Sequence, residues 1–528
     1  MRDHFSGRTD GPENAQPDEA PRRFDVLLTA AEAFPAFEEA FLGARQEIVA
    51  AFRVFDPFTK LRSDAARRIG DHWFDLIVNT LNRGVKIDLM ISDFDPVVRL
   101  EMHRSAWQAL RGLTAAAEAS SHPENLQARV AMHPARVGLL PRTLLWPKSL
   151  KEVAGHAEDL NKLDQASRQK ALATAPGLRA LTQEMPDGRI SAKKFPPPPL
   201  FPVTHHQKIA VFDDDLLYVG GLDLDNRRFD DPNHNRPGDQ TWHDVQVMVS
   251  GPAVLEAKTH LQTMEKCFHG AASSQPRSIL RTISGRRRFA LPFMSPKRQV
   301  GEIMQAHLDA IGRTEKLIYC ETQFFRDREL ADAIVKRAAA CPDLSMILLL
   351  PAAPDDIAFS SDWGPDAAFG EHLQVQCLDR LHDAFGDRLF VGSPVKKRTS
   401  DSDGRDAHFG SPIIYIHAKV SLFDARYGII SSANLNGRSM KWDTECGVQT
   451  ETAAEAQQIK KRCFSHWLGD APDDAFFDLD KATTAWTDRA ESNARSAPED
   501  RQGFIVPYRT APARNDAQPL PGVPEAMA

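Results

Sequence analysis

Two stretches of one pattern, HQKIAVFD at residues 206–213 and HAKVSLFD at residues 417–424, decide how this chain is expected to fold. Each stretch carries a histidine, a lysine two residues later and an aspartate five residues after the lysine, with an apolar run before the aspartate. In an extended strand, residues i and i+2 point to the same side, so the histidine and the lysine of each stretch should face together. One short match arises easily by chance, but two matches about 200 residues apart predict two related halves.

The same order of predicted elements precedes each stretch: helix, strand, helix, strand. These elements are expected at residues 31–46, 47–55, 73–82 and 85–91 in the first half, and at residues 299–311, 316–325, 329–340 and 344–350 in the second. Strands that alternate with amphipathic helices favour an α/β fold. We therefore expect two duplicated α/β/α sandwich lobes with pseudo-two-fold symmetry and an active site at their interface. Ordinary α/β alternation without duplication is the alternative.

The length of 528 residues suits two large lobes. The predicted division is a disordered tail, a first lobe, a linker, a second lobe and a C-terminal segment that is mostly loop or tail. Their expected ranges are 1–24, 25–270, 271–291, 292–480 and 481–528. The first lobe contains a long helical insertion at about residues 101–184 and a proline-rich loop at residues 195–202. This loop is either a stiff apolar rim suited to acyl chains or a bilayer, or a rigid linker.

Composition narrows the class of protein. The chain is 42% hydrophobic and 26% charged, as in soluble globular proteins. No apolar run has the length of a membrane span, and residues 1–24 lack the apolar segment of a secretory signal. A cytoplasmic location, or a peripheral one at membranes, is therefore expected; export by a signal-independent route, as an effector or virulence factor, is the alternative. The net charge of −7 argues against a nucleic-acid partner, and a monomer is expected.

The six cysteines show no CxxC pair and no metal-ligand spacing. This pattern indicates reduced thiols and predicts no metal.

The residue types of the two stretches suit a phosphodiester. If the two strands meet across the lobe interface, His206, Lys208, His417 and Lys419 converge. Ammonium groups stabilise the charge that builds on the non-bridging oxygens in the transition state. One neutral imidazole can attack phosphorus while the other, protonated, donates to the leaving alkoxide.

A histidine in such a role needs an acceptor on its other ring nitrogen. Two carboxylates stand at the start of apolar strand-like runs: Asp244 is expected to hold His206, and Glu445 is expected to hold His417. A surface position or a structural ion pair is the alternative for either carboxylate. Asp213 and Asp424 follow their lysines at an odd offset, which turns them away from the lysine's side, and they are expected to fix turns.

A second paired element follows each aspartate, GGLD at residues 220–223 and SSAN at residues 431–434. Small residues there let the backbone approach a phosphate, so Gly221 and Ser432 are candidate substrate-binding positions. Asn434 can donate its amide to a phosphoryl oxygen. Asp223, the fourth candidate at this position, cannot donate when ionised and is expected to hold a backbone turn or a lysine.

Together these motifs resemble the phospholipase D superfamily, whose signature is the duplicated HxKxxxxD pattern. The resemblance also covers RRFD at 227–230, WHD at 242–244, IYCETQFF at 318–325 and DTE at 443–445, and it extends over roughly residues 28–470. Ser431 stands where the family's second motif usually has glycine. The resemblance implies ping-pong chemistry without metal or cofactor, in which His206 forms a phosphatidyl-histidine and His417 protonates the released alcohol and then activates water.

The implied activity is hydrolysis of phosphatidylcholine-type glycerophospholipids at a membrane surface to phosphatidic acid and free alcohol, with transfer to other alcohols as a second outcome. The alternatives are a phosphodiesterase or nuclease of the same superfamily, and a non-catalytic lipid-binding relative. Superfamily members that make cardiolipin usually carry N-terminal membrane spans, which are not visible here.

Overall fold

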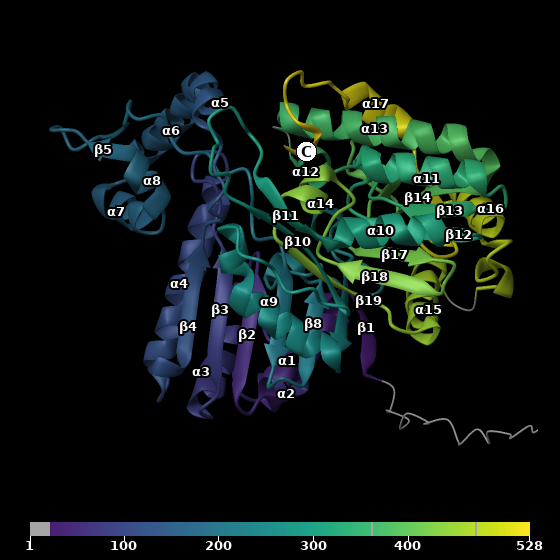
Figure 1. Ribbon diagram of the computed structural model, residues 1–528, viewed down its shortest axis with the longest axis horizontal. Helices are drawn as coiled ribbons and strands as arrows, with labels where there is room; N and C mark the ends of the chain where they lie inside the picture. The colour runs from purple at the N-terminus through teal and green to yellow at the C-terminus, as the bar shows by residue number, and fades with distance from the viewer. Residues whose placement is uncertain (1–21, 361–362, 470–471, 528) are drawn as a thin grey trace, which may run out of the picture.

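The computed structural model describes residues 22–360, 363–469 and 472–527 of the chain. It forms two α/β lobes that lie side by side, with a small helical subdomain above the first lobe (Figure 1). Most of the predicted N-terminal tail lies outside the described residues, but the last residue of that range, Phe24, already begins strand β1.

The first lobe is built on a seven-stranded sheet with the order β1-β9-β8-β7-β2-β3-β4. Its strands are β1 (Phe24–Leu28), β2 (Glu47–Phe52), β3 (Lys86–Ser92), β4 (Leu126–Ala131), β7 (Lys208–Phe212), β8 (Leu216–Gly220) and β9 (Val245–Val249). Strands β2, β3 and β4 pair in parallel, and all other pairs are antiparallel. The helices of this lobe are α1 (Thr29–Gly43), α2 (Asp64–Arg67), α3 (Trp73–Asn82), α4 (Leu100–Ala119) and α9 (Pro252–Phe268).

The second lobe has a nine-stranded sheet with the order β11-β10-β19-β18-β17-β12-β13-β14-β20. Its strands are β10 (Ile279–Gly285), β11 (Lys297–Gly301), β12 (Leu317–Thr322), β13 (Ser345–Leu349), β14 (Leu389–Pro394), β17 (Lys419–Phe423), β18 (Tyr427–Ser431), β19 (Glu445–Gln449) and β20 (Ile505–Pro507). Its helices are α10 (Glu302–Arg313), α11 (Arg328–Ala340), α12 (Asp355–Phe359), α13 (Pro365–Phe385), α14 (Gly437–Lys441), α15 (Ala453–Leu468), α16 (Ala482–Arg495) and α17 (Thr510–Asp516). A small hairpin, β15 (Ala407–His408) with β16 (Ser411–Pro412), lies outside this sheet.

The two sheets repeat one plan. Strands β10-β19-β18-β17-β12-β13-β14 have the order and the parallel or antiparallel pairing of β1-β9-β8-β7-β2-β3-β4, and β11 and β20 extend the second sheet at its edges. Both HxK stretches therefore enter equivalent central strands, β7 and β17, whose side chains are buried on both faces. The predicted fold class, an α/β protein, is confirmed.

Each sheet is covered on both faces by helices. In the first lobe α1, α3 and α4 pack on one face and α9 on the other, and in the second lobe α10, α11 and α13 oppose α15 and α16. Helix α3 shows the sequence logic: Trp73, Leu76, Ile77 and Leu81 recur at helical spacing and are buried, and Asp75 accepts hydrogen bonds from the backbone at its start. The core that contains α9, α15 and α16 is continuous between the lobes.

The helical insertion is shorter than predicted. Within the range 101–184, α4 packs on the first sheet and β4 forms its edge, so this part belongs to the lobe itself. The inserted subdomain consists of α5 (Leu139–Leu144), α6 (Trp146–Asn161), α7 (Gln165–Ala173), α8 (Pro176–Leu181), β5 (Thr182–Glu184) and β6 (Ile190–Ala192).

Three further boundaries differ from the prediction. The range 271–291 is not only a linker, because β10 lies within it and pairs with β19. The helix expected from residue 299 starts three residues later, since β11 continues to Gly301. The segment 481–528 is not mostly tail: α16 buries Trp486, β20 pairs with β14, and α17 lies against α13. The composition of this segment is rich in Ala, Pro and Asp, and it therefore gave little indication that a few of its side chains are buried.

Among the described residues, none of the helices combines the length and the apolar character needed to cross a bilayer.

Candidate active site

The site lies where the ends of β7 and β17 face each other across the lobe interface. His206 and His417 each lie two residues before the first residue of their strand, and the backbone of each is hydrogen-bonded to the other lobe. The His206 N–H donates to the carbonyl of Thr444 at 2.8 Å, and the His417 N–H donates to the carbonyl of His243 at 2.7 Å. The backbone of each candidate catalytic histidine is therefore fixed by a carbonyl group of the opposite lobe.

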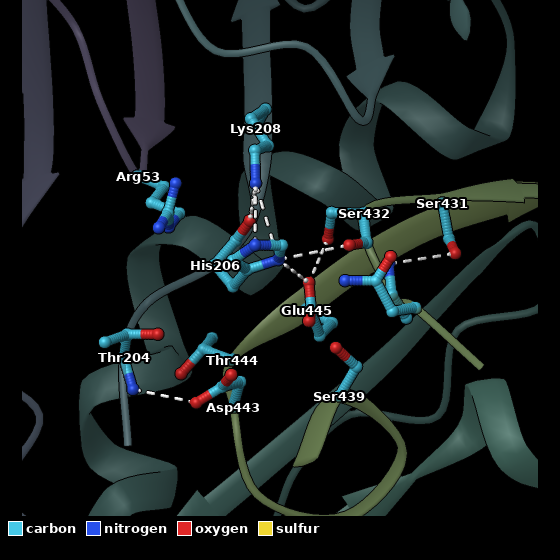
Figure 2. Close-up of polar contacts among 12 residues, drawn as sticks. Arg53, Thr204, His206, Lys208, Ser431, Ser432, Ser439, Asp443, Thr444 and Glu445 are labelled. Carbon is cyan, nitrogen blue, oxygen red and sulfur yellow. Dashed lines mark hydrogen bonds and ion pairs between the residues drawn. The ribbon is translucent and has the colours of Figure 1, made fainter. Parts of the chain in front are cut away.

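The orienting carboxylates are exchanged between the lobes, which corrects the predicted pairing. Glu445 Oε2 lies 3.0 Å from His206 Nδ1 (Figure 2), and Asp244 Oδ2 lies 2.5 Å from His417 Nδ1. Within one lobe β8 separates β9 from β7, so a residue at the start of β9 is two strand spacings, about 10 Å, from the histidine of its own lobe. The facing lobe has no strand in between and brings its carboxylate within reach.

The tautomer of His206 follows from a second contact. Its Nδ1 also lies 3.1 Å from the carbonyl oxygen of Ser432, which can only accept a hydrogen bond (Figure 2). Nδ1 therefore carries the proton, and Nε2 has a free lone pair. This is the arrangement that a nucleophilic or basic imidazole needs.

Both lysines are buried beside their histidines. Lys208 Nζ donates to the carbonyl of His206 at 2.6 Å and lies 3.4 Å from both ring nitrogens of His206. Lys419 Nζ contacts the carbonyl of His417 and lies 2.8 Å from His417 Nδ1. Each half thus presents an imidazole and an ammonium group together.

The electrostatics link the four groups into one site. Burial lowers the pKa of His206 and His417 well below the usual histidine range, and the positive charges of both Lys208 and Lys419 lower each of them further. Burial also lowers the pKa of Lys208, and that of Lys419 to about 7. An anion bound between the lobes would offset the effect of burial and favour the charged forms of both lysines.

The two carboxyl groups differ in their surroundings. Burial raises the pKa of Asp244 to about 6 and that of Glu445 to about 8. Lys419 opposes the rise most strongly at Asp244, whereas the negative charge of Asp443 adds to it at Glu445. Glu445 Oε2 also accepts a hydrogen bond from the Ser432 hydroxyl at 2.5 Å. The two orienting groups therefore favour different protonation states.

The paired small-residue elements lie at the same site. A side chain at Gly221 would place its Cβ 2.2 Å from Asp244 Oδ1, so this position has no room for one. Asn434 donates its amide to Gln323 Oε1 at 3.1 Å. Asp223 accepts from the Val54 N–H at 2.9 Å, and its other oxygen lies 3.9 Å from Lys208 Nζ. The Asp223 carboxylate thus contacts both a backbone turn and the lysine.

The two aspartates that end the HxK stretches lie away from this site. Asp213 accepts hydrogen bonds from the backbone N–H groups of residues 45–47, and Asp424 accepts from those of residues 315–317. Both have positive φ angles, 50° and 51°. Each carboxylate fixes the turn that follows its strand to the loop before a neighbouring strand.

Sequence reasoning missed Arg53. It follows β2 directly, its guanidinium lies 3.5 Å from Asp223 Oδ2, and it points towards His206 and Lys208 (Figure 2). The equivalent residue after β12 is Gln323, which contacts Asn434. The sequence could have indicated Arg53, because a polar residue directly follows the equivalent apolar strand, β2 or β12, in each half.

A cavity of about 650 Å³ opens beside Arg53. Arg53, Arg111, Lys170 and Arg228 form its basic part, and side chains of β3, α4 and the loops after β2 and β3 form its apolar part. The apolar lining includes Phe55, Phe58, Ile91, Phe94, Met102 and Ala106.

Comparison with known proteins agrees with this geometry. The family model described as "Cardiolipin synthase, PLD-like domain" matches residues 307–467. Phospholipase D2 of Bos taurus is 31% identical over 242 residues, which cover 36% of this chain and 25% of the relative. Phospholipase D alpha 1 of Vigna unguiculata is 24% identical over 362 residues, covering 45% of this chain and 44% of the relative.

The matches span less than half the length of these two relatives. Among solved structures, the phosphatidylserine synthase of Haemophilus influenzae Rd KW20 is similar with a TM-score of 0.44 and 13% identity, over 84% of this chain and 86% of that one.

The α/β fold brings the two HxK stretches and their orienting carboxylates together at one buried site between the lobes. The family match within the second lobe and these relatives show that the chain is similar to proteins of the phospholipase D superfamily.

Proposed function

We propose that the chain is a phospholipase D that hydrolyses the head-group phosphodiester of phosphatidylcholine-type glycerophospholipids to phosphatidic acid and free alcohol. The observation that carries the proposal is the exchanged pair of histidine–carboxylate contacts, which bring two imidazoles and two buried ammonium groups together where the lobes meet.

In the first step His206 Nε2 attacks phosphorus, and the bond from phosphorus to the head-group oxygen breaks. His417 gives its proton to the leaving alkoxide, so the alcohol departs and a phosphatidyl-histidine remains. Water then attacks phosphorus, His417 takes its proton, and phosphatidic acid leaves as the bond to His206 breaks. Lys208 and Lys419 stabilise the charge on the non-bridging oxygens in both steps.

The unequal carboxyl groups support this assignment. The pKa of His417 is lowered by burial, and two anions would oppose this lowering when His417 carries a proton: the bound phosphodiester and Asp244, the carboxyl group with the lower pKa of the two. Glu445, with the higher pKa, suits a His206 that stays neutral and nucleophilic. The proton on His206 Nδ1, directed at Ser432, leaves Nε2 free for attack.

An apolar rim supports a lipid rather than a nucleic-acid substrate. It consists of exposed side chains from α5 and from two neighbouring loops: Leu139, Leu140, Leu144, Phe195, Phe289 and Leu291. Backbone hydrogen bonds join α5 to the loop of residues 290–293, and Phe195 packs edge-on against Trp146. Exposed apolar clusters of this kind mark membrane or protein contacts, and the chain's net charge of −7 disfavours DNA.

Substrate class is tested by incubating the protein with phosphatidylcholine vesicles and ethanol, and separately with bis-p-nitrophenyl phosphate and with DNA. We expect choline, phosphatidic acid and phosphatidylethanol, since ethanol competes with water for the same intermediate. Digestion of DNA without lipid turnover would instead identify a nuclease of the superfamily. Absence of any turnover would favour a lipid-binding relative.

The exchanged pairing predicts which variant depends on the leaving group. Asp244→Asn impairs the acid, His417, so its rate loss, about 10²-fold or more with a choline ester, should shrink with a p-nitrophenyl ester that needs no protonation. Glu445→Gln impairs the nucleophile, His206, so its loss should persist with both esters. Single-turnover rates for the two esters distinguish the cases, and the opposite pattern would assign each carboxylate to its own lobe's histidine.

The apolar rim predicts an interfacial effect. Leu144 is 84% exposed, and Leu144→Asp is expected to reduce turnover of phosphatidylcholine vesicles about tenfold by removing one inserted apolar side chain. Turnover of a soluble diester should not change. Leu255→Asp, at an exposed leucine of α9, is the matched control and should behave as wild type in both assays. If Leu144→Asp and Leu255→Asp turned over phosphatidylcholine vesicles at equal rates, the proposed contact between the apolar rim and the membrane would be contradicted.

A further inference from the structure

Three histidines that the proposed chemistry does not use converge behind the second catalytic histidine. His234 lies in the loop after β8, His243 directly precedes the Asp244 that contacts His417, and His466 lies on α15 of the second lobe. One ring nitrogen from each of them lies within 4.8 Å of the other two. We call this set the histidine cluster. It joins both lobes at one point.

Carboxylates fix two of the three rings. Asp230 Oδ2 accepts from His234 Nδ1 at 2.7 Å, and Glu321 Oε2 accepts from His243 Nε2 at 3.1 Å. Each contact places the proton on the outer nitrogen and leaves the inner one, His234 Nε2 or His243 Nδ1, with a free lone pair. Carboxylate–histidine pairs of this kind orient metal-binding imidazoles and raise their basicity.

One of the inner nitrogens lacks a hydrogen-bond partner among the described residues. His243 is fully buried, and its Nδ1 has no hydrogen-bond partner among the described residues. An unpaired buried polar atom costs about 1–3 kcal/mol unless something else satisfies it. His234 Nε2 and His466 Nε2 face each other at 3.0 Å. At this distance the His466 Nε2–H can donate to His234 Nε2 when no ion is bound, whereas His243 Nδ1 has no partner in the described part of the chain.

These distances suit a tetrahedral cation. Zinc binds imidazole nitrogen at about 2.0–2.1 Å, which places two ligand nitrogens roughly 3.3 Å apart. The spacing of the His234 and His466 nitrogens is close to that value, and all three ligand nitrogens lie within 4.8 Å of one another, so binding an ion requires the rings to shift inward. Trp467 and Phe504 pack against the ring of His234 and shield the cluster, while His466 is partly exposed and leaves a side open to water.

We propose that His234, His243 and His466 bind one divalent transition-metal ion of the zinc class, with water as the fourth ligand, and that this ion fixes the two lobes to each other. Imidazole ligands select zinc, copper, nickel and iron over calcium and magnesium. The ion touches no substrate. It acts by position, because the carbonyl of His243 accepts the N–H groups of His417 and Ala418 and the next residue is the orienting Asp244.

The sequence gives no sign of this site. The ligands come from a loop, from the residues before β9 and from a helix of the other lobe, so they form no short spacing pattern. The expectation of no metal was drawn from the cysteines and from the resemblance to the phospholipase D superfamily, whose implied chemistry does not involve these three histidines.

The test uses the full chain, stripped with chelator and then titrated with Zn²⁺ or Co²⁺ alone. We expect one equivalent of Zn²⁺ bound per chain by mass spectrometry of the metal, and a rise in Tm of about 5 °C at saturation. Co²⁺ should give the intense visible absorption of a tetrahedral site. His466→Gln should lose the bound metal, the colour and the rise in Tm, while the metal-free Tm stays near that of wild type because His466 is partly exposed.

The matched control is His382→Gln, at an exposed histidine in the last turn of α13, which should bind as wild type. The proposal would be overturned if the wild-type chain bound no Zn²⁺, or if the His466→Gln variant still bound one equivalent of Zn²⁺. If His466→Gln does not fold, the wild-type chain alone tests the site. A Tm that does not rise when Zn²⁺ is added would contradict the proposal. None of these readouts uses turnover, so they are independent of the proposed phospholipase activity.

Discussion

Replacing His206 with asparagine should reduce turnover by about 10⁴-fold or more, and His417→Asn should do the same. Asparagine retains a hydrogen-bonding amide of similar reach, but it can neither attack phosphorus nor exchange a proton at neutral pH. Both histidines are buried and lie against the opposite lobe, so thermal melting must show that each variant keeps the wild-type fold. His382→Asn, at the surface, is the control for the substitution itself.

The two variants should fail at different points. With a p-nitrophenyl ester, which departs without protonation, His417→Asn should form the covalent intermediate and then retain it, because no group activates water. Mass spectrometry of peptides should find the phosphoryl group on His206. His206→Asn should show no adduct with any ester. A near-wild-type rate for either variant, or an adduct on His417, would contradict the paired roles.

Removing either lysine's charge has the second largest expected effect. Lys208→Met and Lys419→Met keep most of the side-chain volume and lose the ammonium group, and each should lower kcat by about 10²–10³-fold. The reason is that both ammonium groups are buried, where charge stabilisation of the transition state is strong and water cannot replace it. The lysines also lower the pKa of both histidines, so each substitution disturbs the timing of proton transfer.

The measurement is kcat and KM with a soluble diester, which avoids effects of vesicle binding. Lys258→Met offers a control at a lysine of α9 that forms ion pairs with Glu47 and Asp214, away from the site. It should retain wild-type kcat. A change confined to KM in Lys208→Met and Lys419→Met would show that the lysines bind the ground state and transition state equally, against the proposed role.

The repeated HxK stretches predict the central strands and the position of the site, because strand periodicity alone puts histidine and lysine on one side. The sequence does not reveal which carboxylate contacts which histidine. Asp244 and Glu445 lie nearer in sequence to their own lobe's histidine, and only the strand order, with β8 and β18 in between, shows why the facing lobe supplies the acceptor.

Composition gave a wrong prediction for a segment that contains many polar residues but is held in the fold by a few buried apolar side chains. The segment after residue 480 reads as a tail, yet Trp486 and Ile505 are buried in the second lobe and β20 extends its sheet. Arg53 was missed because a single basic residue after an apolar strand is common. Its significance appears only with Asp223, which comes from the element after β8.

The central claim is that both halves act on a single phosphorus atom. A crystal structure of the protein with vanadate tests it most directly, since five-coordinate vanadate imitates the geometry of in-line transfer. The account predicts one vanadate held between the lobes, with His206 Nε2 bonded to vanadium and His417 Nε2 on the oxygen opposite, and with both lysines on the equatorial oxygens. Vanadate bound to one half alone, with the other histidine out of reach, would contradict it.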